Sequence, residues 1–151
     1  MNDVSIDANS LGLLEDRLNQ LTSGEVYKVI QSAIMAAGRQ LKKATEQQLK
    51  ADMGSKATRD VINGDKTYPP LISGVRMGTK NKDYLEVNVN IMGHGFLKWF
   101  EKGTSLRSTG SGANRGSISA INFFATAQSA AQSAMDSAVS QSIERSIDKL
   151  L

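Results

Sequence analysis

The chain has 151 residues and a net charge of +3, with 40% apolar residues but only 5% aromatic ones. This length suits a single domain, residues 1–151, with a core of aliphatic and alanine side chains. The absence of cysteine excludes disulfides, thiolate nucleophiles and zinc–thiolate sites, and no apolar run approaches the roughly 20 residues that span a bilayer. Residues 1–10 are polar and acidic, unlike a secretory signal, so we expect a protein that stays in the cytosol where it is made.

The charged residues are unevenly distributed. Residues 1–24 carry one basic and four acidic side chains, a net charge of −3, whereas residues 25–82 carry eleven basic and five acidic ones, a net charge of +6. Such a division is typical of a phosphate-facing surface, or of charge matching between copies that associate head to tail. Lysines that only keep a surface solvated give the same counts, so charge alone leaves all three interpretations open.

Two helices are predicted in the first third of the chain. Within residues 1–24, leucines at positions 11, 14, 18 and 21 have the spacing of one helix face, with Ser10 as N-cap and an end near Gly24. The Thr-Ser-Gly-Glu sequence at 22–25 predicts a capping box, followed by a longer helix over residues 25–52. The apolar face of that helix comprises Val26, Val29, Ile30, Ala33, Ile34, Ala37, Leu41 and Ala44. Its small residues, Gly38 among them, are expected to let another element approach closely.

Residues 53–103 are predicted to hold a loop, a β-hairpin and an aromatic turn. The polar stretch 53–70 is interpreted as a long loop, with a short strand at 58–62 as an alternative. Residues 71–79 and 84–92 are expected to pair as a hairpin, because apolar residues alternate with polar ones in the second arm. Residues 96–101 are predicted to form one helical turn buried against the sheet, with Trp99 or Phe100 as the core anchor.

The last third of the chain is predicted to be a loop followed by a helix. Residues 104–117 hold four serines, three glycines, Arg107 and Arg115 but no acid, which indicates a flexible basic loop. Residues 118–151 follow as a helix capped by Ser117 or Ser119. Phe124, which is also expected to be a core anchor, begins its narrow apolar stripe. Alanines continue the stripe at positions 127, 131, 134 and 138.

Few residues suit catalysis. His94 is the only histidine and stands between two glycines after a strand, where a turn residue is expected and a Ser-His-Asp triad is not. The carboxylates of Asp60 and Asp65 lie in a polar loop without the apolar surroundings that tune catalytic acids. Glycines at 110, 112 and 116 miss the spacing of a phosphate-binding loop by one residue. We therefore expect neither an enzyme nor a bound metal or cofactor.

One ordered set of motifs is more specific. The Tyr-Pro-Pro-Leu-Ile-Ser-Gly-Val-Arg sequence at 68–76 enters a strand, and Phe-Leu-Lys-Trp-Phe-Glu-Lys-Gly-Thr follows at 96–104. A basic loop comes next, and then Ile-Asn-Phe-Phe at 121–124 opens an alanine-rich helix. Over residues 25–140 this order resembles the tail-completion, or head–tail joining, family of tailed bacteriophages, most sharply at Glu-Lys-Gly-Thr. The proline that usually introduces the last helix of that family is absent here.

The resemblance implies an α+β subunit in which long N-terminal and C-terminal helices pack on a small antiparallel sheet with long flexible loops. Copies would form a ring, a hexamer in the expected form, at the head–tail junction of the virion after assembly in the host cytoplasm. Its partners would be the head-side connector or stopper proteins and the tail tube or tail terminator protein, with genomic DNA passing non-specifically through the channel. The candidate interface residues are Lys98, Glu101, Thr104, Arg107 and Arg115.

A second function class stays open. A small basic nucleic-acid-binding module would use the basic face of residues 28–50 together with the loop arginines. Such a module usually interleaves aromatic residues with its basic stripe, or presents a helix-turn-helix. Here the aromatic residues cluster at 96–100, away from the basic helix, which favours the neck subunit.

Overall fold

The computed structural model of the protein describes residues 15–17, 19–79 and 85–151. It is an α+β fold, as expected: two long helices accompany short helical turns and two separate two-stranded antiparallel sheets, rather than one sheet. The elements are α2 (Ser23–Met53), η1 (Gly54–Ala57), β1 (Val61–Asn63), β2 (Lys66–Tyr68), η2 (Leu71–Gly74), β3 (Arg76–Thr79), β4 (Val87–Asn90), α3 (Leu97–Lys102) and α4 (Phe123–Leu150).

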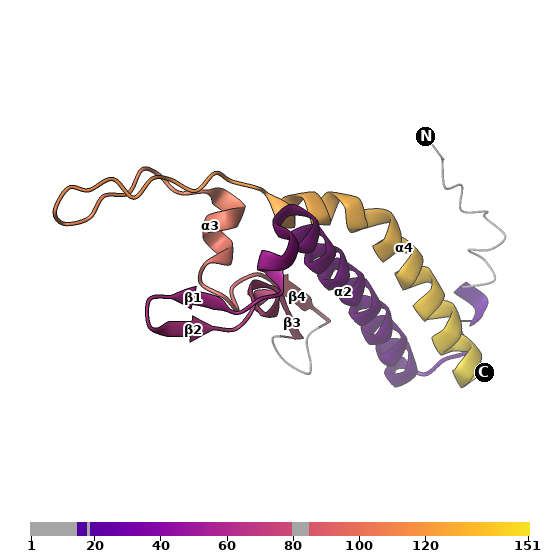
Figure 1. Cartoon of the computed structure of the whole chain (residues 1–151). Coiled ribbons are helices and arrows are strands. Elements are labelled where there is room, and N and C mark those ends of the chain that lie inside the picture. Colours follow the sequence, from indigo (N-terminus) through magenta and orange to yellow (C-terminus); the bar gives the residue numbers. More distant parts are fainter. Residues whose placement is uncertain (1–14, 18, 80–84) are drawn as a thin grey trace.

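The two long helices lie side by side and run in opposite directions (Figure 1). Helix α2 begins within two residues of its predicted start and ends one residue beyond its predicted end. Three leucines of the expected first helix, at 11, 14 and 18, lie outside the described residues. Residues 15–17 are helical, and Arg17 forms an ion pair of 2.5 Å with Asp148 near the end of α4.

The capping box at the start of α2 is confirmed. The backbone N–H and the hydroxyl of Thr22 both donate to the Glu25 carboxylate at 2.8 Å, and the Glu25 backbone N–H donates back to the Thr22 hydroxyl. The two hydrogen bonds that the Glu25 carboxylate accepts from the backbone N–H and the hydroxyl of Thr22 lower the pKa of Glu25 below its ordinary value of 4.5. Lys28 makes a smaller contribution in the same direction. The box satisfies backbone groups that the first helical turn leaves unpaired.

This lowered pKa predicts a pH-dependent contribution to stability. A carboxylate whose pKa is depressed in the folded state stabilises the fold above its unfolded pKa, and loses that effect as the pH falls through the folded value. We expect Glu25→Gln to unfold at a lower temperature than the wild type at neutral pH, with the difference shrinking below pH 4.5. Thermal unfolding followed by circular dichroism between pH 7 and pH 2.5 measures this. A difference that does not change with pH would contradict it.

Gly38 lets the β3–β4 hairpin pack on α2, as its position on the small-residue face predicts. A Cβ atom at Gly38 would stand 2.6 Å from Cγ1 of Val87 and 3.0 Å from Sδ of Met77. The strands pair with Met77 opposite Val89 and Thr79 opposite Val87. The predicted hairpin is therefore present, and its connection, residues 80–84, lies outside the described residues.

The stretch predicted as a long loop contains more structure than expected. Strands β1 and β2 pair around Gly64 and Asp65, with Asn63 opposite Lys66, and Gly64 has the positive φ of 62° that such a tight turn needs. The hairpin signal in the sequence is the Gly-Asp pair at 64–65, the two residues that separate the strands. Residues 71–74 form a 3₁₀ turn instead of the start of a strand, and this turn buries Leu71.

The main core lies where the β3–β4 hairpin and the short helices meet the C-terminal end of α2 and the N-terminal end of α4. Its members are Leu49, Ala57, Leu71, Val75, Ile91, Leu97 and Phe123. The three predicted anchors are not among its buried members: Phe100 and Phe124 are half-buried and pack against it, while the half-buried Trp99 has its ring centre 5.3 Å from that of Phe96. In a helix Trp99 points about 200° away from Leu97, which takes the inward position.

Candidate assembly interface

The Glu-Lys-Gly-Thr sequence at 101–104 forms a junction between α3 and α4. Helix α3 ends at Gly103, whose φ is 73° and whose N–H donates to the Trp99 carbonyl at 2.7 Å. A Cβ atom at Gly103 would stand 2.8 Å from the Ile118 carbonyl oxygen and 2.9 Å from the Ala120 nitrogen. Both the backbone conformation and the close approach of the returning chain therefore require glycine here.

Glu101 caps the last helix from outside that helix. Its carboxylate accepts hydrogen bonds from the backbone N–H groups of Phe124 at 2.8 Å and Ala125 at 3.1 Å. The residue at the N-cap position, Asn122, is left-handed with φ 50°, and its side chain makes no capping bond. The expected caps, Ser117 and Ser119, precede the helix by several residues, so that prediction is wrong. A carboxylate at this end also interacts favourably with the helix dipole.

Thr104 holds the two sides of the junction together through hydrogen bonds to Ile118. Its backbone N–H donates to the Ile118 carbonyl at 2.8 Å, and its hydroxyl accepts from the Ile118 N–H at 2.9 Å. Of the five candidate interface residues, Glu101 and Thr104 are thus engaged within the subunit. Lys98, Arg107 and Arg115 are exposed.

Replacing Glu101 by alanine is expected to lower the free energy of unfolding by about 1–2 kcal/mol, because two N–H groups at the start of α4 lose their acceptor. Lys98→Ala, on the same short helix and exposed, serves as the control and should change stability by no more than about 0.5 kcal/mol. Urea denaturation of the three proteins measures both values. Equal stability of the Glu101→Ala variant and the wild type would show that water replaces the cap.

Residues 104–118, here called the arm, cover the predicted basic loop, and hydrogen bonds pair its two sides. Thr109 donates to the Ala113 carbonyl at 2.9 Å, and Ser108 and Asn114 form a β-bridge. The backbone N–H of Arg107 donates to the Gly116 carbonyl at 3.0 Å, and the Arg107 carbonyl accepts from the backbone N–H of Arg115 at 2.7 Å. Arg115 and Gly116 therefore both face Arg107, as in a β-bulge. Figure 1 shows the arm projecting away from the two long helices.

The arm carries an apolar side chain and two cations into solvent. Leu106 is 73% exposed. Arg107 and Arg115 are exposed and meet across the ladder, although residues 104–117 contain no acid. Within the described ranges, neither guanidinium forms an ion pair. Side chains of this kind contribute nothing to the core of their own subunit and suit contact with another molecule.

His94 is a buried turn residue, which agrees with the expected turn. It is 6% exposed, its Nε2 lies 3.0 Å from the Pro69 carbonyl oxygen, and its ring packs against Phe96. In the described part of the chain, no three His, Asp or Glu side chains gather in an arrangement that could hold a metal ion. Among the same residues, no helix has the length and apolar character needed to cross a membrane.

Comparison with known proteins yields no relatives. The chain matches no protein-family model, no curated protein sequence and no solved structure.

Proposed function

We propose that this protein is a structural subunit of the neck of a tailed bacteriophage, which completes the tail and joins it to the head as part of a ring. The arm is the observation that carries the proposal. It leaves the domain at a junction built by Glu101, Gly103 and Thr104, the sequence on which the resemblance to tail-completion proteins is sharpest.

The physical character of the arm supports a role in assembly. An isolated two-stranded hairpin is marginally stable in water, and this one buries no large side chain: Leu106 is 73% exposed. Docking on a neighbouring subunit would remove Leu106 from water and supply partners for Arg107 and Arg115. An arm that reaches one way from each subunit makes a head-to-tail contact, which closes as a ring when the rotation between copies allows it.

The basic surface of α2 gives weaker support to the alternative of a small basic nucleic-acid-binding module. The rings of Phe96 and Trp99 pack against each other at the start of the short helix α3. They lie apart from the cations of α2, which would need aromatic neighbours to bind bases by stacking. The expected hexamer, the connector and stopper contacts, the contact with the tail tube or terminator and the location at the head–tail junction belong to the neck proposal.

A phage that lacks this gene tests the proposal. We expect its lysates to contain DNA-filled heads and complete tails that do not join, as seen by electron microscopy. Supplying the protein from a plasmid should restore joined, infectious particles. Particles that assemble and infect normally without the protein would overturn the assignment, and tails of uncontrolled length would assign the protein to tail termination instead.

A further inference from the structure

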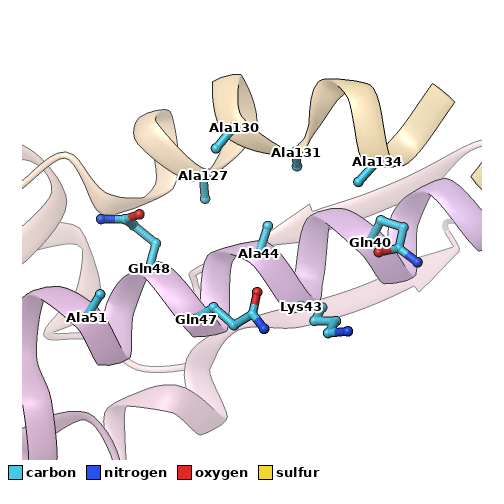
Figure 2. Close-up of a pocket in the computed structure, with 10 residues that line it drawn as sticks. All are labelled: Gln40, Lys43, Ala44, Gln47, Gln48, Ala51, Ala127, Ala130, Ala131 and Ala134. Atoms are coloured by element: carbon cyan, nitrogen blue, oxygen red, sulfur yellow. The ribbon is translucent and has the colours of Figure 1, made fainter. Parts of the chain in front are cut away.

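A groove runs along one side of the two long helices, where α2 and α4 meet. It consists of two adjoining hollows of about 380 Å³ and 320 Å³, and Gln40 lines both. Figure 2 shows the larger hollow, with Ala127, Ala131 and Ala134 of α4 pointing toward α2 and Ala44 pointing back toward them. Because these side chains are small, the two helices pack closely. The same small side chains do not fill the space above the contact, so a shallow channel remains at the surface.

Four cations line the groove, and no lining residue is acidic. Arg39 and Lys43 come from α2, and Arg145 and Lys149 come from α4; all four are exposed. In the part of the chain that the structure describes, none of the four forms an ion pair. Each pair is spaced four residues apart, so two like charges share one face of each helix. That arrangement opposes helix formation mildly unless an anion binds between them.

The smaller hollow, which holds three of the four cations, is otherwise lined by uncharged side chains, five of them polar and two of them alanines. Ser32 and Ser142 bond to each other across the helices at 3.0 Å, and Gln40 and Gln141 lie beside Arg39 and Arg145. Hydroxyl, amide and guanidinium groups are the donors with which proteins contact phosphate oxygens. No aromatic residue lines either hollow, so bases would have no surface on which to stack.

We propose that this groove binds the sugar–phosphate backbone of a nucleic acid, without reading its sequence. From Ser32 to Ala51 the groove follows 20 residues of α2, a length of about 28 Å, which suits an extended polyanion better than a single phosphate. An acidic protein segment is less well matched, because the groove offers no large apolar pocket for the anchor side chains that protein partners use. The binding goes beyond the neck assignment and can be measured on the isolated chain.

The test compares two triple variants that lose the same charge. The groove variant is R39Q/R145Q/K149Q. The control is K56Q/R59Q/K66Q, which removes three exposed cations outside the groove. Binding to a fluorescein-labelled 20-nucleotide single strand is measured by anisotropy from 50 to 300 mM salt. Since glutamine replaces exposed side chains only, both variants should keep the wild-type circular dichroism spectrum and melting temperature.

We expect the groove variant to bind at least about tenfold more weakly at low salt, and the slope of log K against log salt to decrease in magnitude by about 2, because three phosphate contacts disappear. The control should lose less than about threefold with a nearly unchanged slope. The double variant R39K/R145K keeps the charges and should bind like the wild type.

Three outcomes would overturn the proposal: no binding of the strand by the wild type at 50 mM salt, equal losses in the groove and control variants, or a polyglutamate peptide of equal charge binding as tightly as the strand. The last result would assign the groove to an acidic protein partner. The assay uses the free protein, so its failure leaves the head–tail joining experiment standing, and the reverse also holds.

Discussion

Replacing Phe123 by alanine is expected to lower the free energy of unfolding by about 3–5 kcal/mol, the cost of removing a fully buried aromatic ring. Phe123 is the largest fully buried side chain described, with an exposed fraction of 0%. It lies in one core cluster with Leu49 of α2 and Leu97 of α3. Its removal would leave a cavity at the point where α4 meets the rest of the fold. Urea denaturation of the wild type and the variant measures the difference.

Trp99→Ala is the matched comparison. Trp99 is half-buried and contacts Phe96 at the edge of the core, so we expect its removal to cost only about 1–2 kcal/mol. The sequence alone predicts Trp99 or Phe100 as the core anchor, and a buried Trp99 would show the larger loss. A Trp99→Ala variant less stable than Phe123→Ala would show that the ring is more important to the core than its exposure indicates.

Shortening the arm is expected to abolish head–tail joining while leaving the domain folded. In the variant, residues 106–116 are replaced by an Asn-Gly turn, which closes a two-residue hairpin and keeps the pairing of Thr104 with Ile118. No buried core residue is removed. We therefore expect the free energy of unfolding to change by less than about 1 kcal/mol.

The effect on assembly should be much larger. Loss of about 2.7 kcal/mol at one subunit contact lowers its equilibrium constant about hundredfold, and every contact in a closed ring would be affected. We expect infectivity, measured by complementation of a phage that lacks the gene, to fall at least about hundredfold. The charge-preserving double variant R107K/R115K should complement. Full complementation by the shortened protein would remove the arm from the assembly interface.

Local patterns were sufficient for the elements whose signals lie close together in the chain. The Thr-Ser-Gly-Glu box at 22–25 and the apolar periodicity after it predicted α2 nearly to its ends, because capping and amphipathicity depend on residues three or four positions apart. The alternation at 85–91 likewise predicted strand β4, and Gly38 was correctly expected to lie at a close approach.

The inward residues of α3 and α4 could not be chosen from sequence. The aromatic turn offers Trp99 and Phe100 as rival anchors, and size alone favours tryptophan. Which side faces the core depends on how a six-residue helix is held between the hairpin and α4, and Leu97 takes that place. A helix this short has too few residues for its periodicity to mark an inner face.

The sequence by itself determined the α+β class, the long helix α2, the β3–β4 hairpin and the positions of the arm cations Arg107 and Arg115. Only the tertiary structure decided that Glu101 caps α4, that Thr104 and Ile118 close the base of a paired arm, and that Arg39 and Lys43 share a groove with Arg145 and Lys149. The physical reason is separation along the chain. Hydrogen bonds and charge groupings between residues 14 to more than 100 positions apart arise from packing, and no local pattern records them.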